Sequence, residues 1–456
     1  MPAVPLPLTE PDLVIAAAGG SIVRRSALPS GLRVLTEQVP GAVSASVGFW
    51  VPVGSRDESD DAYGSTHFLE HLLFKGTRTR SAFDIAVAFD EVGGEHNALT
   101  AKEHTCYHAK VRDRDLPMAI DVLADMVTSS LIDADEFEHE REVILEELAM
   151  ADDDPGDVAG ERLSALVHGD HALGRPIGGT PASIRAVSRD RVVAHYREHY
   201  EPRELVVTVA GAVDHDAVVA QLQEALERYG WALGEAEPLP RRDRTPSPMG
   251  VGGLAVVERP LEQVSLMIGG PCMRASDPRR ATLSVLNAVL GGGMSSRLFQ
   301  EIRERRGLAY SVYSFASGYA DAGLFGMAAG CAPRKAPEVA ALMVAELERM
   351  AEGVLPDELR RAKGQLSGGS ALALEDTDTR MARLGRAELT LGEFVDIDAA
   401  LERIDAVSDA DVRALAAELA GAPRSVAAVG RVPDGLESAV LAPAPGTVGG
   451  AVTTAP

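Results

Sequence analysis

Cysteine is scarce in this sequence, long apolar runs are missing, and half of the chain has no histidine. The three cysteines, Cys106, Cys272 and Cys331, stand far apart in 456 residues. This odd, scattered set argues against a disulfide framework and against a cysteine-ligated zinc site. It fits a reducing compartment, so we expect a cytoplasmic protein. No stretch of 18 apolar residues occurs, and we therefore expect no membrane insertion. The short apolar run Leu13–Ala18 lacks a preceding basic segment and is not expected to be a signal peptide.

Positive charge is in deficit. Lysine and arginine number 44 against 68 aspartates and glutamates, which gives a net charge of −24. Such a balance argues against nucleic acid and anionic membrane surfaces as partners. It suits basic or unfolded peptide ligands, although solubility explains the sign about as well. At this length we expect two domains rather than one core.

The two halves of the chain resemble each other. Val43–Gly48 matches Val264–Gly269 at an offset of 221 residues, and Ile184–Ser188 matches Ile404–Ser408 at an offset of 220. Two anchors so far apart with nearly one offset favour a duplicated domain over chance similarity. All histidines lie at or before His215. A histidine-ligated metal site can therefore exist only once per chain, in the first half.

Composition divides the chain further. We expect a catalytic domain over 1–235, a linker rich in Pro, Gly and Arg over 236–253, and a metal-free domain over 254–437. The tail 438–456 is rich in Ala, Pro, Gly and Thr and is expected to be disordered. In the first half, hydrophobic periodicity predicts strands around 32–35, 43–53, 97–111 and 205–210, and helices over 81–92, 116–131, 135–151 and 192–199.

One stretch, Tyr63–Thr77, carries a metal-binding pattern. Read as a helix, it places His67 and His71 on one face, where two ring nitrogens can bind one ion at about 2.0–2.1 Å. Glu70 lies beside them and can take a proton from a water whose pKa the ion lowers toward about 7. The alternative without a metal is a core helix that contains two histidines by chance. Two histidines at this spacing beside a carboxylate favour the metal, and H-x-x-E-H is the inverted-zincin signature.

A third ligand must come from elsewhere, because a catalytic zinc uses three protein ligands and one open position. The densest source is the glutamate-rich stretch Glu136–Leu148. In a helix, Glu140 and Glu147 share a face because seven residues are nearly two turns. The spacing alone does not separate Glu146 from Glu147.

Residues Gly64–Thr77 resemble the motif of inverted-zincin metallopeptidases of the pitrilysin and mitochondrial-processing-peptidase family. The similarity runs through nearly the whole folded chain and is greatest to bacterial processing-peptidase-like members. It implies an α+β fold of two duplicated domains, each a mainly antiparallel sheet covered by helices. The run Ile144–Glu147 is similar to the family's Ile-Leu-x-Glu, which implies Glu147 as the third zinc ligand. Glu140 then corresponds to a glutamate that supports the site from behind.

The resemblance also implies substrate-binding segments. Asn97 and Ala98 open a strand similar to the edge on which the family aligns extended peptides. In the second half, Arg303 and Tyr310 would face the zinc site and hold the substrate carbonyl oxygen. The non-functional alternative is that Arg303 is a surface arginine and Tyr310 a core tyrosine. Arg297 is expected to be an ordinary surface charge. The glycines of the implied substrate loop are Gly291, Gly292 and Gly293. No Gly-Lys-Ser/Thr follows them, which argues against a phosphate-binding loop.

Together these features predict a zinc-dependent endopeptidase that cleaves unfolded or short peptides, with one Zn²⁺ per chain and Glu70 as general base. By resemblance we expect a homodimer enclosing a chamber, with Arg303 and Tyr310 reaching the site of the opposite subunit. One alternative is a non-catalytic partner subunit of a processing complex, although such chains typically lose motif residues. The other is zinc-assisted hydrolysis of another substrate, such as S-ribosylhomocysteine, but that enzyme is a single small domain.

Overall fold

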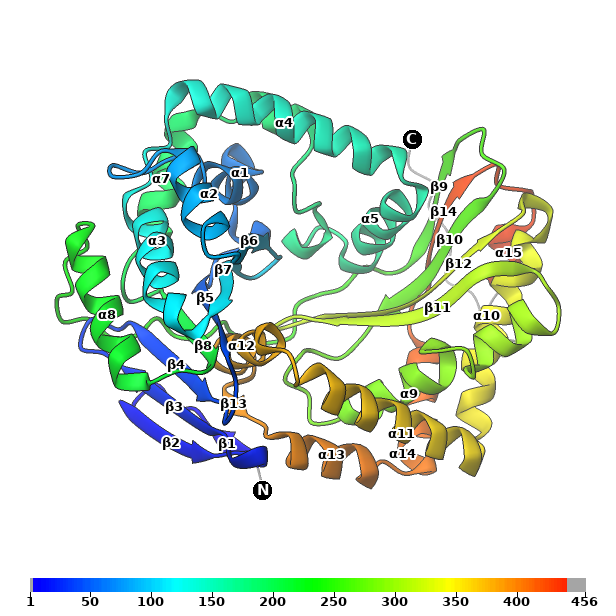
Figure 1. The fold of residues 1–456 in the computed structure, drawn as a ribbon. Helices are drawn as coiled ribbons and strands as arrows, with labels where there is room; N and C mark the ends of the chain where they lie inside the picture. Colours follow the sequence, from blue (N-terminus) through cyan, green and yellow to red (C-terminus); the bar gives the residue numbers. More distant parts are fainter. Residues whose placement is uncertain (1–2, 441–456) are drawn as a thin grey trace.

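The computed structural model describes residues 3–440, which form two lobes, each built on one β-sheet (Figure 1). Of the predicted disordered tail, residues 438–440 end helix α15 (Leu436–Val440), and the remainder lies outside the described residues. No helix within 3–440 is both long enough and apolar enough to cross a membrane. The cytoplasmic location stays a prediction.

The first sheet has seven strands in the order β2-β3-β4-β8-β5-β7-β6. Their bounds are β2 (Asp12–Ala16), β3 (Ile22–Ala27), β4 (Arg33–Gln38), β5 (Ser44–Val51), β6 (Glu95–Thr100), β7 (Thr105–Arg112) and β8 (Val206–Gly211). Only β4 and β8 pair in parallel, so the sheet is mainly antiparallel, as expected. Most of the apolar run Leu13–Ala18 belongs to β2, an edge strand. The other edge is β6, and no strand within residues 3–440 pairs with its outer side.

The first half of the chain also forms a set of helices. They are α1 (Ser65–Leu72), α2 (Ala82–Asp90), α3 (Leu116–Ser129), α4 (Ala134–Asp153), α5 (Pro155–His168), α6 (Pro181–Ala186), α7 (Arg189–His199) and α8 (His215–Arg228). Four of the predicted helices are confirmed to within three residues at each end. The Asp133 carboxylate caps α4 by accepting from the amide of Asp135 at 2.9 Å. Asp154 then caps α5 directly, accepting from the amide of Gly156 at 2.6 Å. The sequence analysis did not predict α5, α6 or α8.

The second sheet repeats the first. Its order is β11-β12-β10-β14-β9, which corresponds strand for strand to β6-β7-β5-β8-β4. The bounds are β9 (Gly253–Glu258), β10 (Val264–Pro271), β11 (Ala309–Gly318), β12 (Gly323–Cys331) and β14 (Ser425–Gly430). The one parallel pair, β9 with β14, also matches the parallel pair of the first sheet. The predicted duplication is therefore confirmed as a shared topology.

The helices of the second half of the chain, besides α15, are α9 (Arg280–Gly291), α10 (Ala336–Glu352), α11 (Pro356–Ala373), α12 (Thr377–Arg386), α13 (Ile397–Ala406) and α14 (Asp409–Gly421). Two π-helical turns span Phe299–Glu304 and Ala387–Leu391. Short 3₁₀ turns lie at Ala18–Gly20, Ser55–Asp57, Asp60–Ala62, Asp113–Asp115, Ala172–Gly174 and Pro333–Lys335. A small sheet pairs β1 (Val4–Pro5) with β13 (Glu393–Phe394).

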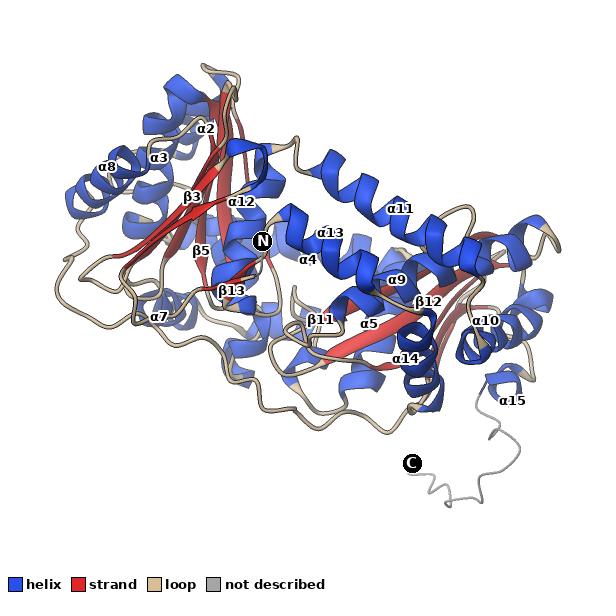
Figure 2. Cartoon of the chain, turned by 90° about the horizontal axis from the view of Figure 1, so that it is seen from below, coloured by secondary structure: helices blue, strands red, loops and turns tan. Residues whose placement is uncertain are grey.

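Each lobe lends one helix to the sheet of the other. Helix α5 follows the first-lobe helices in the chain, yet it packs on β10 and β14 of the second sheet through Leu163 and Val167. In return α12 packs on β5 and β8 of the first sheet. There Trp50 lies so close to Gly385 that a side chain on this glycine would collide with the indole ring. Figure 2 shows α12 against the first sheet and α5 within the second lobe.

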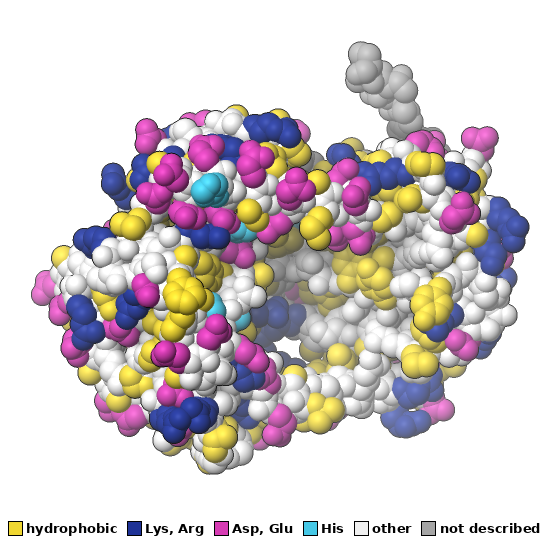
Figure 3. Space-filling view, turned by 45° about the horizontal axis from the view of Figure 1, so that its top comes forward, with side chains coloured by type: hydrophobic (Ala, Val, Ile, Leu, Met, Phe, Trp, Pro, Cys, Tyr) yellow, Lys and Arg dark blue, Asp and Glu magenta, His cyan; other side chains and the backbone are white. Residues whose placement is uncertain are grey.

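The segment between the lobes, residues 231–252, has neither helix nor strand and includes most of the predicted linker. Its arginines anchor it: Arg241 donates to the carbonyl of Leu6 at 2.7 Å, and Arg242 donates to the carbonyl of Glu103 at 3.0 Å. A second tie joins the lobes directly, since Arg56 forms a two-point ion pair with Asp321 at 2.9 Å. Between the lobes the molecular surface is deeply hollowed, and on the face shown in Figure 3 histidine side chains appear only on the first lobe.

Candidate metal and active site

Helix α1 has one buried face and one face open to the hollow. Its apolar residues Phe68, Leu69 and Leu72 are fully buried. The helix period therefore turns His67 and His71 to the opposite, half-buried side. The start of α1 is fixed by Glu58, whose carboxylate accepts from the amides of Gly64 at 2.9 Å and Thr66 at 2.7 Å. An anionic side chain at a helix N-terminus satisfies amides that have no partner within the helix.

Helix α4 brings Glu147 to the two histidines. Its Oε2 atom lies 3.6 Å from Nε2 of His67 and 3.4 Å from Nε2 of His71. The two Nε2 atoms are 3.3 Å apart. Three ligands at tetrahedral corners around a zinc ion with bonds of about 2.0–2.1 Å would lie about 3.3–3.4 Å from each other. The three ligand atoms therefore fit one zinc ion, and the adjacent Glu146 is not part of the cluster.

Glu140 lies nearly two helical turns before Glu147 on α4 and contacts the cluster from behind. One carboxylate oxygen lies 2.9 Å from Nδ1 of His71, and the other lies 2.6 Å from Nζ of Lys75. When His71 donates from Nδ1, the lone pair of its Nε2 is left for a metal. Burial favours a raised pKa for the Glu140 carboxyl, but the hydrogen bonds from Lys75 and His71 outweigh it and lower the pKa. Lys75 is a contact that the sequence analysis missed, although it follows His71 by four residues.

His67 is suited to bind as a neutral ligand. Burial lowers its pKa, and the nearby ring of His71 lowers it further. Its Nδ1 atom is buried without a hydrogen-bond partner in the described chain, whereas Nε2 faces the cluster. Gly178 lies against the other side of the ring, where an added Cβ would be 3.4 Å from Nδ1. The ring is thus held with the Nε2 lone pair toward the shared point.

Glu70 lies in the pocket that opens beside the cluster. This pocket has a volume of about 460 Å³ and is lined by Glu70 together with His67 and Glu147. Its walls come from the end of β6, from α5 and from the segment 174–178. A carboxylate that shares a pocket with the metal ligands and is not itself a ligand is placed to exchange protons with a water there.

Strand β6 leads into the same pocket through Leu99 and Thr100. Leu99 is 52% exposed, and the outer edge of the strand is unpaired within the described residues. Nearer the start of the strand, the amide of Ala98 is occupied by the side-chain oxygen of Asn97 at 2.8 Å. An unpaired edge next to a pocket suits β-addition of an extended peptide. Peptide alignment by Asn97 and Ala98 stays a prediction.

Arg303 and Tyr310 lie together in the second lobe, away from the metal cluster of their own chain. The Arg303 guanidinium stacks 4.5 Å from the Tyr310 ring centre and donates to the Tyr310 carbonyl at 2.9 Å. Tyr310 is 77% exposed, and neither residue lines the pocket of His67. Gly318 is the end of β11 nearest the first lobe, and Tyr310 precedes it by eight residues. At roughly 3.3 Å per strand residue, Tyr310 lies about 26 Å along the strand from Gly318. The catalytic role of Arg303 and Tyr310 stays a prediction.

The glycine-rich loop is shaped by packing. A side chain at Gly291 would collide with the backbone of Ser314 on β11, and one at Gly292 would lie 2.7 Å from Cα of Ala288. Gln365 on α11 donates to the Gly292 carbonyl at 2.7 Å, and its side chain also lies against Gly293. Close approach of neighbouring backbone accounts for Gly291 and Gly292. Substrate binding by this loop stays a prediction.

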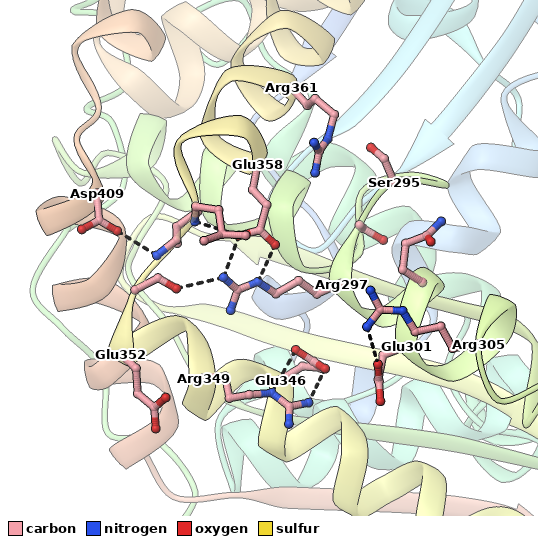
Figure 4. Close-up of a pocket in the computed structure, with 15 residues that line it drawn as sticks. Ser295, Arg297, Glu301, Arg305, Glu346, Arg349, Glu352, Glu358, Arg361 and Asp409 are labelled. Carbon is pink, nitrogen blue, oxygen red and sulfur yellow. Dashed lines mark hydrogen bonds and ion pairs between the residues drawn. The ribbon is translucent and has the colours of Figure 1, made fainter.

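A larger pocket of about 1030 Å³ lies beyond this loop, between the π-helical turn Phe299–Glu304 and the start of α11 (Figure 4). Arg297 holds Glu358 there at 2.7 Å, and Arg305 and Arg349 pair with Glu301 and Glu346. Its charges therefore largely satisfy one another, and the pocket contains no residue of the metal cluster. Arg297 corrects the sequence expectation: it is a largely buried tie between the loop and α11, with 14% of its side chain exposed.

Comparison with known proteins agrees with this geometry. Residues 33–181 match the family described as insulinase (peptidase family M16), and residues 186–366 match the peptidase M16 inactive domain. An uncharacterized zinc protease of Streptomyces coelicolor is 49% identical over 92% of this chain and 92% of its own. The chain belongs to peptidase family M16. The uncharacterized zinc protease YmxG of Bacillus subtilis is 36% identical over 87% of this chain and 96% of its own.

Solved structures of M16 proteins share the fold. A Pseudomonas fluorescens peptidase M16 inactive domain aligns with a TM-score of 0.82 at 19% identity, over 90% of this chain and 98% of that one. A Helicobacter pylori protease aligns with a TM-score of 0.78 at 20% identity, over 94% and 100%. The predicted pitrilysin-like family and the duplicated α+β fold are both confirmed. The zinc-protease names of the relatives agree with a metal at the histidine–glutamate cluster.

Proposed function

We propose that this M16 protein is a zinc-dependent endopeptidase acting on unfolded or short peptides. The observation that carries the proposal is the convergence of His67, His71 and Glu147 at tetrahedral-edge distances beside Glu70 and a free strand edge. These three residues would hold one zinc ion per chain. When bound there, zinc supplies Lewis-acid chemistry: it polarises a carbonyl and acidifies water.

The residues of the chain perform the proton and substrate steps. The Glu70 carboxylate accepts a proton from a water in the pocket and later delivers it to the amine that leaves the cleaved peptide bond. Glu140 keeps His71 in the tautomer that offers Nε2 to the cluster. The outer edge of β6 supplies backbone hydrogen bonds that align an extended peptide past Leu99 and Thr100.

The chief alternative is a chain that binds zinc and peptides without cleaving them, as a partner subunit. The complete set of Glu70 with three ligand residues favours catalysis, because a structural zinc needs no free carboxylate beside it. Cleavage of a precursor and degradation of peptides would use the same residues and chemistry.

The decisive experiment compares zinc-loaded wild-type protein with Glu70→Gln on a quenched fluorescent peptide mixture. Wild-type protein should cleave, lose activity with 1,10-phenanthroline and regain it with Zn²⁺. Glu70→Gln should retain one zinc per chain by metal analysis and lose turnover by at least about a hundredfold, since general-base catalysis contributes roughly 10²–10⁴. Pure zinc-loaded wild-type protein that cleaves no peptide would favour the partner-subunit role. Zinc loss in Glu70→Gln would refute its assignment as the base.

A further inference from the structure

The turn 101–104 between β6 and β7 carries Lys102 into the pocket of the metal cluster. Lys102 lines this pocket together with His67, Glu70 and Glu147. It comes two residues after Thr100, the end of the free strand edge. A peptide extended along β6 would therefore pass the metal cluster and the Lys102 side chain in succession.

The backbone of this turn is rigidly held. Gly54 packs so closely on it that a side chain there would collide with the carbonyl of Ala101. The amide of Ser55 donates to the Ala101 carbonyl at 3.1 Å, and the amide of Arg56 donates to the Lys102 carbonyl at 3.0 Å. Close backbone approach of this kind leaves the turn little freedom. Lys102 is thus presented from a fixed base.

The ammonium group of Lys102 is only partly satisfied. It donates to the backbone carbonyl of Arg175, and no carboxylate within residues 3–440 lies within 4.0 Å of it. By contrast, Lys75 and Lys110 each contact a carboxylate, at 2.6 Å and 2.5 Å. A lysine ammonium has three N–H donors, so two remain for a ligand. Arg175 also lines the pocket, and its guanidinium donates to Asp60 at 3.1 Å and to the carbonyl of Glu58 at 2.9 Å.

Lys102 forms no ion pair with Glu70, Glu147 or Glu161, the carboxylates that line the same pocket. Burial lowers the pKa of Lys102 to about 8, so the group is still mostly charged at neutral pH but poorly hydrated. Glu161 on α5 lines the same pocket and forms no ion pair with Lys102. Burial raises the pKa of the Glu161 carboxyl. A half-buried lysine without an ion-pair partner in a pocket is a candidate functional residue.

We propose that Lys102 forms a substrate subsite for a carboxylate, either an acidic side chain or the free C-terminus, close to the scissile peptide bond. The inference rests on the proposed peptidase function and specifies its substrate class. The subsite would favour an anionic group next to the metal, whereas the net negative charge of the whole chain suggests basic peptides. A charge-assisted hydrogen bond from a poorly hydrated ammonium is the physical source of the preference.

The test uses zinc-loaded full-length protein and quenched decapeptides that carry Glu, Gln or Lys at each position flanking the cleaved bond. A second arm compares free-acid with amidated C-termini, which separates the two sources of carboxylate. We expect kcat/KM to favour one carboxylate source by about tenfold over its neutral counterpart. Lys102→Met should abolish that ratio while still cleaving the neutral peptide, and Lys102→Glu should shift the preference to Lys.

Lys363→Met serves as the matched control, because Lys363 lies on α11 and donates only to the carbonyl of Asp405. Its peptide preference should equal that of wild-type protein. Equal cleavage of all peptides by wild-type protein, or full discrimination by Lys102→Met, would overturn the subsite.

A binding arm keeps the subsite testable without turnover. Fluorescence anisotropy on zinc-loaded Glu70→Gln should show about tenfold tighter binding of the carboxylate peptide than of its neutral counterpart, and Lys102→Met in that background should remove the difference. If wild-type protein cleaves nothing while this difference holds, the peptidase function fails and the subsite stands. Equal binding of both peptides would overturn the subsite whether or not cleavage occurs.

Discussion

Three of the glutamates on α4, namely Glu140, Glu146 and Glu147, should affect zinc affinity in a graded order that the geometry predicts. Glu147 contacts both histidine Nε2 atoms at 3.4–3.6 Å, Glu140 contacts only the far nitrogen of His71, and Glu146 contacts neither ring. We therefore expect Glu147→Gln to weaken zinc binding most. Glu140→Gln should weaken it by about 10–100-fold, the usual effect of losing a hydrogen-bonding partner behind a ligand. Glu146→Gln should leave it within error of wild type.

The same order can be expressed as stability. At free zinc well above Kd, bound metal adds RT ln([L]/Kd) to the free energy of unfolding. Each tenfold loss of affinity removes about 1.4 kcal/mol of that gain, so a hundredfold loss removes about 2.7 kcal/mol. For a unit of 150–250 residues this corresponds to a fall of about 5–10 °C in the zinc-induced rise of Tm.

Two measurements together check the prediction. Competition with a chromophoric chelator gives Kd for each variant, and calorimetry with and without zinc gives the metal-dependent part of Tm. Without zinc, Glu147→Gln should unfold like wild type, because the side chain is 45% exposed and surface changes usually cost less than about 0.5 kcal/mol. Glu146→Gln weakening zinc more than Glu147→Gln would refute the ligand assignment. Glu140→Gln with unchanged affinity would refute the supporting role of Glu140.

Two further predictions concern pH and assembly. Burial lowers the pKa of Lys102 to about 8, and Glu161, Arg175 and Glu58 are the charged groups around it. Lys102 must be charged to bind a carboxylate. The preference for the carboxylate peptide should therefore be full below about pH 7 and vanish as the pH rises through about 8. The ratio of kcat/KM for the carboxylate and neutral peptides between pH 6 and 10 measures this, and a constant ratio would contradict it. Mixing inactive Glu70→Gln with Tyr310→Phe chains should restore activity if Tyr310 serves the site of another subunit. Absence of rescue in verified mixed dimers would exclude that placement.

The sequence predicted the parts of the site that are local along one helix. The spacing of His67 and His71 on α1 follows directly from the helix period, and the duplication was visible from two anchors at nearly one offset. The choice of Glu147 over Glu146 came from family resemblance, because two adjacent residues on a helix differ only in direction. That direction depends on how α4 crosses α1, which no local pattern encodes.

Contacts between distant segments could not be predicted. Lys75 reaches Glu140 across the packing of α1 on α4, and the turn that carries Lys102 packs against Gly54, almost 50 residues earlier in the chain. Helix α5 was missed for a related reason. Its apolar face packs on the second sheet, so its apolar residues contact strands that lie more than 90 residues later in the chain. Arg297 looked like a surface charge because its partner Glu358 lies 61 positions away.

The exchanged helices connect the architecture to the chemistry. Helix α5 packs on β10 and β14 of the second sheet with one face, while Gly160, Glu161 and Ser164 line the pocket of the metal cluster with another. One wall of the pocket is therefore set by the second lobe, although no residue after 178 lines it. A first lobe produced alone would expose Val158, Leu163 and Val167 and would lose the support that positions this wall. The second lobe, which has no histidine, thus shapes the pocket of the metal cluster through α5, a helix that comes from the first half of the chain.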